Sequence, residues 1–312
     1  MNPKSKRILF LGTPEISARL LEALILDGFN IVGVVTKVDA PVGRKQVLTP
    51  PPVKTMAEKY GIPVNQFVKV RDGIDVLERY NADAIVCIAY GQIVPEVLLN
   101  TMKIGSLNFH GSLLPKYRGA APLQRAIMCG ENVSGVTAME MVKAMDAGKM
   151  YAKLEIPIAH EDTYSSYREK FITAVIPFAL NILPQYLSGA LTGLEQNEAD
   201  VTFAPMISKE ECHLTCSNGV ESFINTIRGL SDEPGAFLNS KKGVLKIFQA
   251  SRYSSRVIAA IGNINKCDKD GFVLQLNDGE VKLEILQLPG KNRLFWRDFI
   301  NGNKDFLDTI LE

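Results

Sequence analysis

The stretch RILFLGTPEISARLLEALILDGFNIVGVVT, residues 7–36, decides the fold. Residues 7–12 and 31–36 are short apolar runs, which are typical of strands buried on both faces. The segment between them predicts a helix, with Thr13 as its N-cap, Pro14 in its first turn and a glycine just after its end. A strand, a helix and a second strand in this order predict parallel pairing, and therefore an α/β sheet.

The same alternation continues along the chain. Apolar runs at 84–90 and 104–110 predict further strands, and helical segments are expected at 53–60 and 95–102. Together these elements predict an α/β fold with an open, mostly parallel, Rossmann-like sheet. The later elements are two strands, at 135–142 and 152–158, and a long helix from about residue 163 that Pro177 and Pro184 interrupt.

The pattern changes beyond residue 190. Residues 191–208 are polar and lack a helical period, which is typical of a linker. After them come one helical segment, GVESFINTIRGL, and three strand-like runs, VLKIFQAS, GFVLQL and VKLEILQL, which predict a smaller β-barrel, OB-like domain. We therefore expect one domain at 1–190, a linker at 191–208 and a β-rich domain at 209–312.

Net charge, cysteine spacing and the lengths of the apolar runs argue against several classes of protein. The chain has 312 residues and a net charge of +1, so a nucleic-acid partner would have to use a local basic patch. Five cysteines without Cys-x-x-Cys spacing argue against a disulfide framework and for a reducing compartment. Cys212, His213 and Cys216 have no second ligand pair at zinc-site spacing, so no metal is expected. The N-terminal apolar run is too short for a signal peptide, and no run is long enough for a membrane span. We therefore expect a cytoplasmic protein without a membrane partner.

A row of polar side chains lies at the end of a predicted strand. In SLNFH, residues 106–110, apolar side chains alternate with Ser106, Asn108 and His110, which places the polar row on one face. Ligands of open parallel sheets bind at the carboxyl ends of the strands. Asp146, in the turn MDAGKM, could come close to this end.

Asparagine, histidine and aspartate suffice for acyl transfer when a second substrate brings its own amine. The Asn108 amide can donate to an oxyanion, and His110 can donate to the same oxygen or move a proton. Asp146 can orient and charge the imidazole. Each residue also has a structural interpretation, as a hydrogen-bonded strand-end residue or as part of a turn, which spacing alone does not exclude.

The segment after the second strand breaks the α/β pattern. Residues 37–54, KVDAPVGRKQVLTPPPVK, are rich in proline and carry several basic side chains. A loop of this length inside an α/β unit is functional or mobile more often than not, and the alternative is a solvated surface excursion. Dinucleotide binding is disfavoured, because GTPEIS after the first strand has a single glycine; the sequence has no P-loop either.

Beyond these patterns, the sequence resembles the methionyl-tRNA formyltransferase family over nearly its whole length. The segment NFHGSLLPKYRGAAPLQRAI is similar to the central signature of that family at almost every position. Further similar segments are LGTPEIS, VVTKVDAPVGRKQVLTPPPVK, VCIAYGQIVP, SGVTAMEMVKAMDAGKM, FAPMISKEE and ILQLPGKNR. Asn-x-His with a distant Asp is shared by all folate-dependent formyltransferases. GAAPLQRAI is narrower, because the sugar enzymes usually carry an Arg where this chain has Ala120.

The resemblance implies transfer of a formyl group from 10-formyltetrahydrofolate to the α-amine of methionine on initiator Met-tRNA, by a monomer that needs no metal. Asn108, His110 and Asp146 would be the catalytic residues of the first domain. The folate site would be lined by Ile88, Tyr90, Gly91, Ser112, Leu113, Leu114 and Pro115. Arg44 and Lys45, in the long loop, would approach the tRNA, which the C-terminal domain would also contact.

The chain departs from the family pattern at several places. DAGK, residues 146–149, stands where members usually have Asp-Thr-Gly-Asp, and GRKQV, residues 43–47, where they usually have Gly-Arg-Gly-Lys-Lys. Two tryptophan-bearing segments after the linker are replaced by HLTC and LSDEPGAF. Two other functions stay open: a folate-dependent formyltransferase acting on a small amine such as an amino sugar, and a non-catalytic RNA-binding paralogue.

Overall fold

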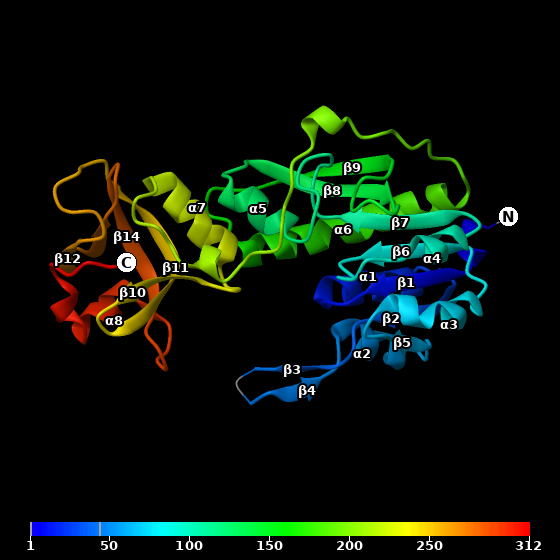
Figure 1. The fold of residues 1–312 in the computed structure, drawn as a ribbon, viewed down its shortest axis with the longest axis horizontal. Helices are drawn as coiled ribbons and strands as arrows, with labels where there is room; N and C mark the ends of the chain where they lie inside the picture. The colour runs from blue at the N-terminus through cyan, green and yellow to red at the C-terminus, as the bar shows by residue number, and fades with distance from the viewer. Residues whose placement is uncertain (1, 44) are drawn as a thin grey trace. The chain divides into compact units, whose positions relative to one another are not determined.

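The computed structural model describes residues 2–43 and 45–312, which form two compact units (Figure 1). The larger unit comprises Met1–Ala120, Gly135–Ile156 and Lys170–Ala204. The smaller unit comprises Ala121–Ser134, Pro157–Glu169 and Pro205–Glu312. The chain therefore passes between the units several times, and the domain boundaries expected from the sequence stay predictions.

The larger unit is built on a seven-stranded sheet with the order β5-β2-β1-β6-β7-β8-β9 (Figure 1). The strands are β1 (Ile8–Gly12), β2 (Ile31–Thr36), β5 (Val64–Gln66), β6 (Ala84–Ile88), β7 (Gly105–His110), β8 (Val133–Glu140) and β9 (Met150–Pro157). The first five in the spatial order pair in parallel, and β8 runs antiparallel to β7. The predicted open, mostly parallel sheet is confirmed.

Helices pack on the parallel strands. They are α1 (Glu15–Leu26), α2 (Pro52–Lys59), α3 (Ile74–Glu78) and α4 (Glu96–Asn100). The strand side chains Leu9, Ile85 and Cys87 share one buried cluster with Leu77 of α3 and Leu98 of α4. Helices α1 and α2 pack against β1 and β2. Because parallel strands end at one edge of the sheet, the loops after β1, β6 and β7 meet there.

The start of α1 differs from the prediction. Its N-cap is Pro14, with no side-chain cap, and the Thr13 hydroxyl donates instead to the carbonyl of Tyr90 at 2.8 Å. The Ser17 hydroxyl, in the first turn of α1, donates to the carbonyl of Ile88 at 2.7 Å. The predicted capping role of Thr13 is therefore wrong, because its hydroxyl ties the turn after β1 to the turn after β6.

The long segment after β2 contains a hairpin of β3 (Ala40–Val42) and β4 (Val47–Thr49), which pair antiparallel (Figure 1). Every described residue of both strands is exposed, and Lys45 is exposed near the tip. At the base, Lys54 Nζ lies 2.9 Å from Asp39 Oδ2. Hydrogen bonds from Lys54 and Gln66 hold the pKa of Asp39 below its usual range. The charge of Lys54 is therefore neutralised, and Arg44 lies outside the described residues.

Helix α6 (Tyr164–Leu187) is continuous, with Pro177 and Pro184 inside it. The predicted interruption is wrong, because packing of the buried side chains outweighs the hydrogen bonds that the prolines remove. The expectation that no run is long enough for a membrane span is also wrong: among the described residues, α6 alone is long and apolar enough to cross one, by length and composition. Its fully buried side chains, such as Tyr167 and Ile172, are typical of a core helix in a soluble protein.

The smaller unit holds an antiparallel sheet with the order β10-β11-β14-β13-β12, and β15 pairs with β14. The strands are β10 (Ala236–Ser240), β11 (Gly243–Ser254), β12 (Ile264–Asp268), β13 (Gly271–Gln275), β14 (Glu280–Gln287) and β15 (Leu294–Phe295). The helices are α5 (Pro122–Met128), α7 (Val220–Leu230) and α8 (Trp296–Asn301). The 3₁₀ turns among the described residues of both units are η1 (Pro3–Ser5), η2 (Val70–Gly73), η3 (Glu198–Asp200), η4 (Glu210–Cys212) and η5 (Lys304–Phe306).

The C-terminal residues link the two edges of this sheet. The Ile264 N–H of β12 donates to Thr309 O at 2.9 Å, and the Glu312 N–H donates to Asn239 O of β10 at 3.1 Å. The chain end therefore lies between β12 and β10 and completes the predicted small barrel. Its interior is filled by apolar side chains of the strands, of α7 and of α8, among them Phe223, which is fully buried.

Candidate active site

Strand β7 carries two of the candidate residues to the carboxyl edge of the large sheet. Asn108 pairs in register with Cys87 of β6 and with Met139 of β8, and it is half-buried. His110, the last residue of β7, is 6% exposed. The two side chains are two residues apart in a strand, so they lie on the same face.

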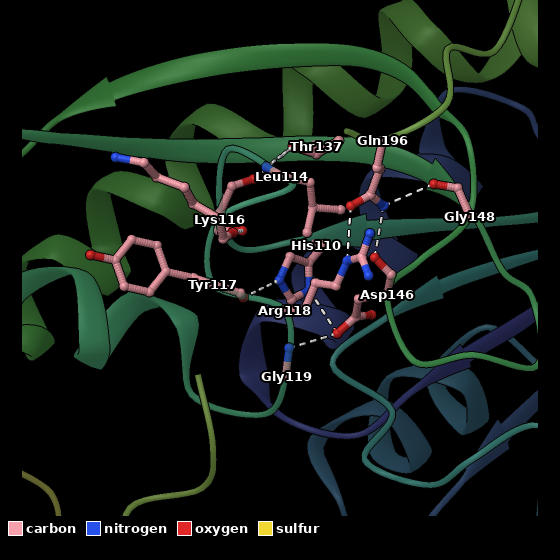
Figure 2. A network of polar contacts seen from close by, with 11 residues as sticks. His110, Leu114, Lys116, Tyr117, Arg118, Gly119, Thr137, Asp146, Gly148 and Gln196 are labelled. Carbon is pink, nitrogen blue, oxygen red and sulfur yellow. Dashed lines mark hydrogen bonds and ion pairs between the residues drawn. The ribbon is translucent and has the colours of Figure 1, made fainter. Parts of the chain in front are cut away.

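The imidazole of His110 is held from both sides (Figure 2). Its Nε2 lies 2.9 Å from the carbonyl oxygen of Tyr117, an acceptor, so Nε2 carries the proton in this arrangement. Its Nδ1 lies 3.6 Å from Asp146 Oδ2. The structure therefore brings His110 and Asp146 together, 36 residues apart in the chain, with Nδ1 facing the carboxylate.

Asp146 lies in the turn between β8 and β9 and adopts a φ of 52°. This left-handed conformation is easier for aspartate than for most side chains. The same Oδ2 that faces His110 accepts the Gly119 N–H at 2.9 Å. Gly119 has a φ of 128°, and a Cβ there would lie 2.6 Å from the carbonyl oxygen of Ala204, so only glycine fits. The carboxylate is thus fixed by the loop after β7.

Unusual backbone conformations gather in the loops at this edge. Ala89, after β6, has a φ of 48°, and Tyr117, which accepts from His110, has a φ of 63°. Asp146, in the β8–β9 turn that reaches His110, is a third non-glycine residue with a positive φ. Such conformations persist when the surrounding structure enforces them, and they cluster at functional sites.

Cys87, the neighbour of Asn108, is a nucleophile only as a thiolate. Burial raises its pKa to about 12, and the negative charge of Asp146 acts in the same direction. The thiol therefore stays neutral. Transfer at this site needs another nucleophile, and a substrate amine meets that need.

The predicted folate segment Ser112, Leu113, Leu114 and Pro115 follows His110 and is tightly held. The Thr137 hydroxyl of β8 donates to Ser112 O at 2.7 Å and accepts the Leu114 N–H at 3.1 Å. Ser112 and Leu114 are fully buried, whereas Leu113 and Pro115 are half-buried. The turn has a fixed shape beside the polar row, and the surface it offers comes from Leu113 and Pro115 and from its backbone.

The other predicted folate residues are Ile88, the last residue of β6, and Tyr90 and Gly91 in the turn after it. Thr13 and Ser17 donate to the carbonyls of Tyr90 and Ile88, as described above, and no local pattern predicts that role. Ile88 and Tyr90 are buried, and Gly91 is exposed with a φ of 78°. The Tyr90 hydroxyl is buried with no hydrogen-bond partner among the described residues, and burial raises the pKa of the phenol. It is therefore a neutral donor.

The predicted tRNA-contacting pair falls on the β3–β4 hairpin. Lys45 is exposed there, and Arg44 lies outside the described residues. Among residues 2–43 and 45–312, no three His, Cys, Asp or Glu side chains are grouped so as to hold a metal ion.

Two buried polar residues next to the site were not predicted from the sequence. Arg118 follows Tyr117, and Gln196 lies in the segment expected to be a linker; they are 6% and 8% exposed. Figure 2 shows both beside Asp146. An Arg in a basic turn and a Gln in a polar run carry no local signal of burial, so only the folded chain reveals them.

Comparison with known proteins identifies the family. Residues 6–176, more than half of the chain, match a model described as formyl transferase, and residues 206–304 match its C-terminal domain. The chain belongs to the formyl transferase family. The Asn108, His110 and Asp146 group lies within the first match.

Relatives in this formyl transferase family are similar over nearly the full length of the chain. A methionyl-tRNA formyltransferase of Macrococcus caseolyticus is 41% identical over 303 residues, which cover 96% of this chain and 97% of the relative. One of Bacillus mycoides is 40% identical over 308 residues and covers 98% of each chain. An N-formyltransferase of Helicobacter canadensis, solved with folinic acid and dTDP-3-aminofucose, shares the fold. Its TM-score is 0.67 at 18% identity, over 89% of this chain and 98% of that one.

Proposed function

We propose that this chain transfers the formyl group of 10-formyltetrahydrofolate to the α-amino group of methionine on initiator tRNA, a step in translation initiation. The observation that carries the proposal is the contact of His110 with Asp146 on the face that also presents Asn108. It occurs in a chain about 41% identical, over 96% of its length, to a methionyl-tRNA formyltransferase.

In the proposed mechanism the methionyl amine attacks the formyl carbon. The C=O electron pair moves to the oxygen, and the Asn108 amide donates a hydrogen bond to the resulting oxyanion. His110 Nδ1 takes the proton that the attacking nitrogen loses, and the Asp146 carboxylate at 3.6 Å stabilises the positive charge on the imidazole. The C=O bond then re-forms as the bond from the formyl carbon to the folate nitrogen breaks, and the His110 imidazolium gives its proton to that nitrogen.

The geometry favours the proton-transfer role of His110 over direct donation to the oxyanion. Nε2 already donates to Tyr117 O at 2.9 Å, so Nδ1 is the ring nitrogen left to accept a proton. The neutral Cys87 thiol supports direct attack by the substrate amine, because no thiolate stands beside Asn108 to form an acyl intermediate.

For the donor, we propose a folate site between two segments: Ile88, Tyr90 and Gly91 at the end of β6 and in the turn after it, and Ser112, Leu113, Leu114 and Pro115 after β7. Both segments lie at the carboxyl edge where ligands of open parallel sheets bind. For the acceptor, we propose that Arg44 and Lys45 contact the tRNA backbone, supported by the exposure of Lys45 and of both hairpin strands.

The setting of the reaction is also part of the proposal. We expect a cytoplasmic monomer that has no membrane partner and needs no metal. We expect residues 1–190 to hold the catalytic domain, 191–208 a linker, and 209–312 a tRNA-contacting domain. Sedimentation of the purified protein with and without initiator tRNA would test the monomer.

The test of the function is a formylation assay with 10-formyltetrahydrofolate and a panel of acceptors. Charged initiator Met-tRNA should be formylated, whereas uncharged tRNA and free methionine should not. A deoxythymidine-diphosphate amino sugar belongs in the panel, because the Helicobacter canadensis structure holds one. If the amino sugar is formylated faster than charged Met-tRNA, the acceptor is a small amine and not the tRNA. If no amine is formylated, the non-catalytic RNA-binding alternative is favoured.

A further inference from the structure

The segment expected to be a linker holds one side chain that is buried. From residue 191 to residue 203 every side chain is exposed or half-buried except that of Gln196, which is 8% exposed. A buried primary amide needs partners for two N–H donors and one oxygen acceptor. The positions of those partners indicate what Gln196 does.

Both N–H donors of Gln196 form hydrogen bonds with the turn that carries Asp146 (Figure 2). Nε2 donates to the backbone carbonyl of Asp146 at 2.7 Å and to that of Gly148 at 2.9 Å. A Cβ on Gly148 would lie 2.2 Å from Glu140 O, so the turn is also packed tightly from the other side. One side chain therefore fixes two of the turn's carbonyls.

The acceptor of Gln196 is used by Arg118. Arg118 Nε donates to Gln196 Oε1 at 3.0 Å, and its Nη2 donates to Glu198 Oε1 at 2.8 Å. Arg118 stands between Tyr117, which accepts from His110, and Gly119, which donates to Asp146. Gln196 is thus bonded to both loops that hold the His110–Asp146 pair.

The same segment is also hydrogen-bonded to the loop after β7 through its backbone. The Tyr117 N–H donates to the Thr202 hydroxyl and the Arg118 N–H to Thr202 O, each at 2.9 Å. The Ala204 N–H returns a bond of 2.7 Å to Arg118 O. Residues 194–204 therefore form a strap across the two loops, with Gln196 as its buried contact to Asp146.

We propose that Gln196 is a positioning residue: it holds the turn of Asp146 in the left-handed conformation that points the carboxylate at His110 Nδ1. An amide suits this position because it donates to two carbonyls and accepts from a guanidinium at once. Since the carboxylate acts on the reacting proton through His110, a turn displaced by about 1 Å lowers kcat by up to about 100-fold. The inference rests on the proposed roles of His110 and Asp146.

Gln196→Glu separates this role from a structural one. Glutamate keeps the size of the side chain and its acceptor for Arg118, but it replaces the donors that face Asp146 O and Gly148 O by an oxygen. We expect a fall in kcat of about 10- to 100-fold with KM for both substrates within about twofold. The matched control is Glu198→Gln, which weakens the other contact of Arg118 and should leave kcat within about twofold.

A double-mutant cycle with Asp146→Asn decides the outcome. If Gln196 acts through Asp146, Gln196→Glu should cost about tenfold or more in the parent and almost nothing in the Asp146→Asn background. Equal cost in both backgrounds, or a parental kcat in Gln196→Glu, would overturn the inference. So would loss of activity that follows loss of folded protein by circular dichroism in both Gln196→Glu and Gln196→Met. If Asp146→Asn alone keeps parental activity, the proposed mechanism fails, and the inference fails with it.

Discussion

Asp146→Asn is the sharpest test of the proposed chemistry, because it changes one charge and little else. Asparagine tolerates the φ of 52° that Asp146 adopts, and its oxygen can still accept the Gly119 N–H. The charge near His110 is lost. Oδ2 and Nδ1 are 3.6 Å apart, with side chains 15% and 6% exposed. At an effective dielectric constant of about 20, the attraction between carboxylate and imidazolium is about 4 to 5 kcal/mol.

In the proposed mechanism that attraction arises when the imidazole carries the proton taken from the amine. It therefore stabilises the transition state and not the ground state, and its loss appears in kcat. Allowing for residual solvent screening, we expect kcat to fall by about 100- to 1000-fold, which corresponds to about 3 to 4 kcal/mol. KM for the folate and the tRNA should change little, because the Asp146 carboxylate accepts a hydrogen bond from Gly119 N–H and faces His110, and is not proposed to bind either substrate.

The assay is steady-state formylation of charged initiator tRNA at several pH values, with circular dichroism as the folding check. Asp308→Asn is the matched control, because Asp308 is also an aspartate with a positive φ, 56°, but it lies near the C-terminus in the smaller unit. It should retain parental activity. A folded Asp146→Asn protein with kcat within about fivefold of the parent would refute the role assigned to the carboxylate.

Three further outcomes are expected. Asn108→Ala should lower kcat by about 100- to 1000-fold with little change in KM, since one oxyanion donor is lost. A raised KM with an unchanged kcat in the same formylation assay would instead make Asn108 a binding residue. Replacing Arg44 and Lys45 by alanine should make the slope of log K against log salt for initiator tRNA shallower by about 1 to 2, as titrations at several salt concentrations would show. An unchanged slope would show that Arg44 and Lys45 do not contact the tRNA phosphates. Glu211→Gln should lower the free energy of unfolding by about 1 kcal/mol at pH 7, because hydrogen bonds from Arg125 lower the pKa of Glu211 from 4.5 to about 2 and its 38% exposure screens the pair. Since the pKa of Glu211 is lower in the folded state, the difference in free energy of unfolding between parent and mutant should be full above pH 4.5 and vanish as the pH falls towards about 2. A difference that persists at pH 2 in urea unfolding would contradict the assignment to the ionised Glu211–Arg125 pair.

Most of the fold could be predicted because its signals are local. The apolar runs of β1, β2 and β6 are buried on both faces and have the length of strands. The missed elements are those whose signals are weak or misleading. The β3–β4 hairpin lies on the surface and has Pro41 in its first strand, so no alternation of apolar and polar residues marks it. Helix α6 contains two prolines, and only its buried packing explains why it continues.

The candidate site could be predicted in part for the same reason. Asn108 and His110 share a strand, so their common face follows from the two-residue period. The meeting of His110 with Asp146 is a tertiary contact, and the sequence supplied it only as an expectation from sheet topology. Thr13 shows the limit of local rules: its position before a helix predicts that its hydroxyl accepts from a helix N–H, but the hydroxyl instead donates to Tyr90 O in another loop. Gln196 had no local signal at all.

Lys149 illustrates how the folded chain absorbs a change that looks serious in the sequence. It stands three residues after Asp146, where the resemblance to the family predicts a carboxylate, and an unpaired cation there would compete with His110 for the negative charge. In the structure Lys149 Nζ lies 3.6 Å from Glu195 Oε1, and both side chains are well exposed, so its charge is paired and screened by solvent. Glu195 directly precedes Gln196, and the carbonyl of Lys149 accepts the Glu140 N–H at 2.8 Å within the β8–β9 connection. The strap that fixes the Asp146 turn through Gln196 therefore also supplies the ion-pair partner of Lys149.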